Sequence, residues 1–195
     1  MTLRKWTWWV GGGLVVLLVF LLGFAWVYRR QRSGDIADGQ MRAALNLSSS
    51  SFADGGNIPN RLTCDAAGLS PEIQWSSPPA GARSFVLVMD DPAFGFVHWL
   101  LYNIPRGARD IPEGASTQSA RPQGAAEGVN DTDKIGYFGP CPPGKSPHRY
   151  VIRVYALNAS LNLPSGKTKK ELAAAVKGHV LAEGQLTGLY GRGSQ

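Results

Sequence analysis

The chain has 195 residues, of which 44% are hydrophobic and 17% charged, and such fractions exclude a mostly disordered protein. Two cysteines are too few for a disulfide-rich scaffold or a four-thiolate zinc site. Of the formal net charge of +6, the first 34 residues supply +5, because the remainder carries 15 basic and 14 acidic residues, and we therefore expect no nucleic-acid binding.

An uncharged stretch from Val10 to Tyr28 predicts a transmembrane helix. Its 19 residues would span about 28 Å, close to the roughly 30 Å hydrocarbon core of a bilayer. Tryptophans lie at both ends, as they do at membrane interfaces. A cleaved signal peptide is the alternative, but its apolar core is usually shorter and is followed by small residues. We therefore expect an uncleaved membrane anchor over residues 1–32, with its helix at about 10–28.

Residues 33–56 are small and polar and include a serine run at 48–51. This composition predicts a flexible tether that leads into the folded part of the chain. We place the tether at 33–44 and one folded domain at 45–195, which is long enough for a single well-buried core.

Strands dominate the expected domain. Apolar and aromatic runs bounded by Pro and Gly predict strands at 84–90, 97–104 and 149–157, with weaker ones at 72–75 and 184–190. A helix near 172–181 is indicated by a capping box at Thr168–Glu171, and His179 would lie on its apolar face. The fold class predicted is mainly β, an antiparallel sandwich with peripheral helices.

Polar residues at strand ends form a candidate site. Asp91 ends a strand and precedes a proline, which presents its carboxylate at a turn. His98 opens the next strand, and this spacing predicts a hairpin with the two side chains close together. After a Gly/Pro-rich loop at 139–147, His148 and Tyr150 share one face of a strand. Together they would line a small concave site, and a purely structural role for each stays open.

These segments resemble the phosphatidylethanolamine-binding protein (PEBP) family, specifically its bacterial YbhB/YbcL-like, or Raf-kinase-inhibitor-like, branch. The resemblance covers about residues 45–192 and implies a β-sandwich with a central antiparallel sheet and peripheral helices. The matching stretches are Leu62–Asp65, Ser70–Trp75, Asp90–Pro92, His98–Trp99, Asn103–Pro105, Gly139–Pro143, Pro147–Tyr150 and the tail Leu161–Arg192.

The resemblance implies a binding module for phosphate-bearing small molecules, phospholipid head groups and other small anions, with no cofactor and no metal. The residues that it assigns to the ligand are Asp91, His98, Gly139, Cys141, Pro142, His148 and Tyr150, with Tyr137 and Pro143 at the rim. One departure concerns the family's Asp-Pro-Asp-Ala-Pro motif, which reads Asp91-Pro92-Ala93-Phe94-Gly95 here. The loop on that side is therefore changed, and the ligand preference is open.

The charges expected at this site favour an anion. Asp91 beside His98 would favour the imidazolium, a charged donor for a phosphate oxygen, and Tyr150 would add a neutral donor. The alternatives are a hydrolase or metal-dependent enzyme that uses Asp91, His98 and His148, and a protease or kinase inhibitor that acts only through surface loops. A homodimer is an expectation by analogy, and no protein partner is identified.

Cys64 and Cys141 both lie in motif loops. A disulfide between them requires Cα atoms within about 7 Å, and two buried free thiols are the alternative. Basic groups are equal in number on the two sides of the predicted membrane helix, so charge does not decide its orientation. Because disulfides persist in the periplasm, a bonded pair would favour a single-pass protein of the bacterial inner membrane with a periplasmic domain.

Overall fold

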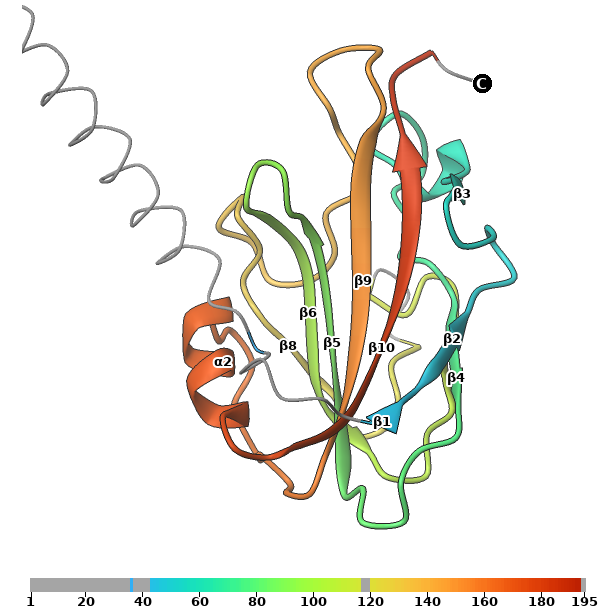
Figure 1. Ribbon diagram of the computed structural model, residues 1–195. Coiled ribbons are helices and arrows are strands. Elements are labelled where there is room, and N and C mark those ends of the chain that lie inside the picture. The colour runs from blue at the N-terminus through green and yellow to red at the C-terminus, as the bar shows by residue number, and fades with distance from the viewer. Residues whose placement is uncertain (1–35, 37–42, 117–119, 194–195) are drawn as a thin grey trace, which may run out of the picture.

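Two β-sheets pack against each other in the computed structural model, which describes residues 36, 43–116 and 120–193. The larger sheet has the strand order β1-β10-β9-β5-β6-β8, with β3 paired to β10, and the smaller has the order β2-β4-β7 (Figure 1). All pairings are antiparallel except those of β1 and β3 with β10. The predicted mainly-β sandwich is confirmed.

The bounds of the elements agree closely with the strongest predictions and extend the weaker ones. In chain order the elements are β1 (Ala43–Ala44), β2 (Asn46–Ser48), β3 (Gly56–Asn57), the 3-10 helix η1 (Asn60–Leu62), β4 (Ile73–Ser76), β5 (Ser84–Asp91), β6 (Phe96–Pro105), β7 (Asp110–Ile111), β8 (Ala126–Glu127), β9 (His148–Leu157), α2 (Lys169–Val176) and β10 (Val180–Tyr190). Within the described residues there is one α-helix, where the prediction was of several peripheral helices.

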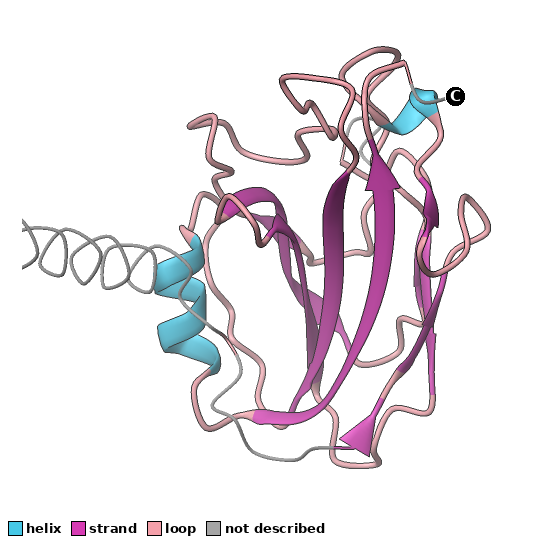
Figure 2. Ribbon diagram, turned by 45° about the horizontal axis from the view of Figure 1, so that its top comes forward, coloured by secondary structure: helices cyan, strands magenta, loops and turns pink. Residues whose placement is uncertain are grey.

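Strand β5 lies at the centre of the larger sheet, between β6 and β9, and all eight of its residues are buried. Phe85, Leu87 and Met89 pack into the core between the two sheets. Val86 and Val88 belong to a second core, which includes residues of α2. Figure 2 shows the helix on one side of the larger sheet and the smaller sheet on the other. This burial on both faces explains why β5 reads as a continuous apolar run.

A buried carboxylate ties α2 to the sheet. Asp90, near the end of β5, lies 2.7 Å from Nζ of Lys169 in the first turn of α2 and 3.0 Å from Nη1 of Arg153 on β9. The helix itself begins with the predicted capping box, in which Thr168 and Glu171 exchange hydrogen bonds. A buried charge costs little here because two cations pair with it.

His179 does not lie on this helix, which corrects the prediction. The helix ends at Val176, and Gly178 then adopts a φ of +79° that turns the chain toward β10. His179 is half-buried in that turn, where its Nδ1 lies 2.8 Å from Oδ1 of Asn158. Apolar residues at helical spacing continued past the turn, and they misled the prediction.

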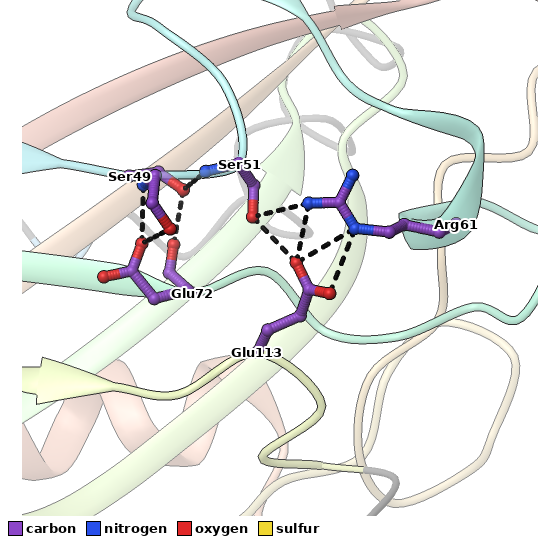
Figure 3. A network of polar contacts seen from close by, with 6 residues as sticks. Ser49, Ser51, Arg61, Glu72 and Glu113 are labelled. Atoms are coloured by element: carbon purple, nitrogen blue, oxygen red, sulfur yellow. Dashed lines mark hydrogen bonds and ion pairs between the residues drawn. The ribbon is translucent and has the colours of Figure 1, made fainter.

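The serine run at 48–51, whose composition is typical of a tether, is built into the fold (Figure 3). Ser49 Oγ donates to the carbonyl oxygen of Glu72 at 2.6 Å, and Ser51 Oγ donates to Oε2 of Glu113 at 2.9 Å. Arg61 pairs with both carboxylate oxygens of Glu113, Nη2 with Oε2 at 2.9 Å and Nε with Oε1 at 3.0 Å. Side-chain hydrogen bonds to a backbone carbonyl and to a carboxylate, both distant in sequence, therefore fix a segment whose composition alone is typical of a linker.

The membrane prediction concerns a different part of the chain. The helix predicted at 10–28, the rest of the anchor at 1–32 and nearly all of the tether at 33–44 lie outside the described residues. Within the described ranges, no helix has the length and apolar character needed to cross a bilayer. The eight residues of α2 extend only about 12 Å, whereas a bilayer core requires about 30 Å. The predicted localisation, single-pass in a bacterial inner membrane with the domain facing the periplasm, is corrected accordingly, because no membrane span supports it in the part of the chain that the structure describes.

Candidate ligand-binding site

A pocket of about 210 Å³ opens where β5 ends and where β6 and β9 begin. These termini meet at one edge of the sheet because both β6 and β9 pair antiparallel with β5 (Figure 1). The lining residues come from the three strands, the turn between β5 and β6, and the loop before β9: Asp91, Phe94, Phe96, His98, Phe138, Cys141, Pro142, Pro143, His148 and Tyr150. The structure thus brings together seven of the residues predicted from the sequence.

Asp91 pairs with His148. The Asp91 side chain is buried (3% exposed), and its Oδ2 lies 2.7 Å from Nδ1 of His148. Its Oδ1 accepts the backbone N–H of Ala93 at 3.0 Å. An ionised carboxylate only accepts hydrogen bonds, so Nδ1 of His148 carries a proton and donates it to Asp91. Both carboxylate oxygens are therefore engaged by the protein.

His98 lies on the floor of the pocket, in surroundings that favour the neutral form of its imidazole ring. Its Nδ1 lies 2.7 Å from the carbonyl oxygen of Phe138, so Nδ1 bears the proton and Nε2 is an acceptor in the neutral ring. Burial lowers the pKa of His98 below 6.5, and the Phe138 carbonyl and the charge of Asp91 oppose this only in part. The expectation of an imidazolium beside Asp91 is thereby corrected, because desolvation outweighs the attraction and Asp91 bonds to His148 instead.

Tyr150 supplies a neutral phenol. Burial, followed by the negative charge of Asp91, raises the pKa of Tyr150, while a backbone hydrogen bond with Cys141 acts in the opposite direction. The hydroxyl therefore stays protonated at any ordinary pH and can donate. Its ring meets His98 edge-on, with 5.1 Å between the ring centroids.

Three phenylalanines line the pocket, and none of them was predicted from the sequence. Phe94 stacks on His148 with ring centroids 4.6 Å apart and planes 4° apart. The ring of Phe96 is tilted against His98 with 4.8 Å between centroids, and Phe138 stacks on His98 with 5.8 Å between centroids. Alternation along β6 could have placed Phe96 on the same face as His98. The other two lie in a turn and a loop, where the sequence carries no periodic signal.

Two predicted residues support the pocket wall without lining it. A Cβ on Gly139 would lie 2.9 Å from the carbonyl oxygen of Leu62 and from backbone atoms of Thr63, so only glycine permits this close approach. The hydroxyl of Tyr137 donates to the carbonyl oxygen of Leu62 at 2.6 Å, and its ring meets Trp99 edge-on at 5.7 Å. Both residues hold the loop before β9 against the segment around η1.

A disulfide fastens the same two segments. Cys64, just after η1, is bonded to Cys141 in the pocket wall, with 5.4 Å between their Cα atoms and a sequence separation of 77. The backbone N–H of Cys64 also donates to the carbonyl oxygen of Pro140 at 3.1 Å. Nη2 of Arg192 lies 3.2 Å and 3.1 Å from the two sulfur atoms, and its Nε lies 3.3 Å from Oδ1 of Asp65. The wall of the pocket is therefore covalently attached to the rest of the fold.

Comparison with known proteins adds a family match. A family model described as phosphatidylethanolamine-binding protein matches residues 48–191. A UPF0098 protein of Methanothermobacter thermautotrophicus is 41% identical over 152 residues, which cover 76% of this chain and all of that protein. A UPF0098 protein of Aquifex aeolicus is 41% identical over 155 residues, or 77% of this chain and 90% of the relative.

Solved structures agree with this match. The Chlamydia trachomatis protein CT736, described as a PEBP homologue, superposes with a TM-score of 0.68 at 35% identity and covers 76% of this chain and 98% of its own. Escherichia coli YbcL, described as a member of the mammalian PEBP family, superposes with a TM-score of 0.71 at 26% identity. The match covers 76% of this chain and 99% of YbcL.

Proposed function

The chain belongs to the phosphatidylethanolamine-binding protein family, and from this premise we propose that its pocket binds phosphate-bearing small molecules. The observation that carries the proposal is the convergence of His98, His148 and Tyr150 on one pocket whose acid, Asp91, already accepts hydrogen bonds on both oxygens. An anion entering this pocket meets the Tyr150 hydroxyl as a donor and two imidazoles that become donors by taking up a proton, and the carboxylate is paired with His148.

Each polar group has a distinct part in the proposed complex. His148, with Nδ1 held by Asp91, offers its other ring nitrogen to a phosphate oxygen, and the charge of Asp91 compensates the imidazolium that forms. The Tyr150 hydroxyl donates to a second oxygen. His98, neutral before binding, accepts a hydrogen bond from a P–OH group or takes up a proton at Nε2. Binding is therefore coupled to proton uptake and favours a slightly acidic pH.

Calorimetric titration of the full-length protein with inorganic phosphate and with phosphoethanolamine tests the proposal. Replacing His148 by Gln removes a charge-assisted hydrogen bond, which is worth about 1.5–3 kcal/mol, and should weaken phosphate binding by about 10- to 100-fold. His179→Gln is the matched control, because His179 lies in the turn before β10 and lines no part of this pocket. The affinity of His179→Gln for phosphate should equal that of the unmodified protein.

Three results would contradict the proposal. One is the absence of phosphate binding at millimolar concentration, and another is an equal effect of the two histidine variants. The third is steady release of phosphate from phosphoethanolamine, which would indicate that the Asp91–His148 pair activates water and that the protein is a hydrolase. Regulation of a protein partner through this pocket and formation of a homodimer stay predictions.

A further inference from the structure

The mouth of the pocket is apolar and its floor is polar. Asp91, His98 and Tyr150 are almost completely buried, whereas Phe94 is 67% exposed. Among the described residues, only Phe94 and Ile135, which is 57% exposed, are large hydrophobic residues with high exposure. Ile135 does not line the pocket and Phe94 does. A bound ligand with its phosphate on the floor would therefore extend past the ring of Phe94.

The position of this ring is fixed by the turn that carries the acid of the site. The backbone N–H of Phe94 donates to the carbonyl oxygen of Asp91 at 3.3 Å, and that of Ala93 donates to Asp91 Oδ1 at 3.0 Å. Gly95 follows with a φ of +65°, a conformation that suits glycine. The stack on His148 holds the ring from one side. The exposed aromatic surface is thus pre-organised, and a ligand need not order it on binding.

The chemistry of the stack favours an apolar group over a cationic one. His148 lies against one face of Phe94, so only the opposite face of the ring is open to a ligand. Asp91 is the only carboxylate that lines the pocket within the described part of the chain, and it is paired with His148. An ammonium group on the ligand would therefore lack a free counterion.

We propose that Phe94 selects phosphate monoesters whose ester group is flat and apolar, aromatic groups above all, over free phosphate and over esters with an ammonium group. The inference rests on the proposed function, because it assigns a ligand class to the same pocket. Offset or face-to-edge contact of a ligand ring with Phe94 and Phe96 adds dispersion and burial of apolar surface to the polar contacts of the phosphate.

Calorimetric competition among three probes tests the inference: inorganic phosphate, phenyl phosphate and phosphocholine. In the unmodified protein, phenyl phosphate should bind about tenfold more tightly than inorganic phosphate. Phe94→Ala should reduce this ratio to about two, and the ratio is taken within each variant because loss of the stack on His148 also affects the binding of inorganic phosphate. Ile135→Ala, the matched change at an exposed hydrophobic residue outside the pocket, should keep the tenfold ratio. Circular dichroism would verify that each variant is folded.

Two outcomes separate the failure of this inference from that of the proposed function. If inorganic phosphate binds but the phenyl phosphate ratio does not change in Phe94→Ala, the role of Phe94 is refuted and the anion site stands. The same holds if phosphocholine binds as tightly as phenyl phosphate, since the pocket would then recognise a cation. If neither inorganic phosphate nor phenyl phosphate binds, both proposals fail.

Discussion

Replacing Cys64 and Cys141 together by serine opens the covalent link between the segment after η1 and the pocket wall. The bond closes a loop with a sequence separation of 77. In the chain-entropy treatment, a crosslink of this span lowers the entropy of the unfolded chain enough to stabilise the fold by about 4.5 kcal/mol at 25 °C. Domains of this size have total stabilities of about 5–15 kcal/mol, so the double variant should lose a large part of its margin.

Urea unfolding, followed by far-UV circular dichroism, measures this loss. The unfolded chain expands without the crosslink, so the slope of the unfolding free energy against urea should rise as the midpoint falls. The single variant Cys64→Ser opens the same loop and should lose about as much stability as the double variant and as the unmodified protein reduced by dithiothreitol. A loss below about 1 kcal/mol in all three would refute the loop-closure argument.

Two further predictions follow from burial and from close contacts. Burial lowers the pKa of His98 in the folded state, so on acidification the unfolded chain takes up the proton first. The folded state is therefore not penalised by His98 above about pH 6.5. Below that pH the free energy of unfolding falls by at most about 1.4 kcal/mol per pH unit. Urea unfolding at pH 7.5 and 5.5 should therefore show a smaller decrease for His98→Gln than for the unmodified protein, and equal decreases would contradict the assignment. Gly184→Ala would drive a Cβ into the carbonyl oxygen of Leu45 and should lower the free energy of unfolding by about 1–3 kcal/mol. In the control Gly107→Ala, the Cβ meets nothing within 4 Å, and the free energy of unfolding should change by less than about 0.5 kcal/mol. Thermal unfolding measures both changes. Similar losses in both glycine variants would refute the steric argument.

The central strands were predictable because their residues are apolar on both faces and end at Pro or Gly. Strand β10 was predicted only from residue 184, because Leu181 and its neighbours extend the helical spacing of α2, and the turn at Gly178 carries more weight than that spacing. The contacts of the serine run could not be predicted for a different reason. Its partners, Glu72 and Glu113, are distant in sequence, and composition contains no information about them.

The polar members of the pocket were predictable, but their pairing was not. Asp91, His98 and His148 all lie at strand ends, which the apolar runs locate. Proximity in sequence favoured a contact between Asp91 and His98. Strand β5, however, has β6 on one side and β9 on the other, so the carboxylate has two neighbours, and the structure shows its hydrogen bond to the one 57 residues away. Phe94 gave no signal, because an aromatic residue in a turn follows no period.

Burial on both faces has a consequence for the folding fidelity of β5. A strand with polar and apolar residues in alternation resists a one-residue slip, because the slip would expose its apolar side. Strand β5 lacks this safeguard, since residues on both of its sides are buried. A slip that moves Asp90 to the place of Asp91 would still put a carboxylate beside His148, but it would put Met89 beside Lys169. Volume also distinguishes the two registers: the layer between the sheets holds Phe85, Leu87 and Met89, and the helix layer holds the smaller Val86 and Val88. The acid of the pocket is therefore placed by the size of side chains in the core and by the ion pair of Asp90 with Lys169, because His148 alone would accept either carboxylate.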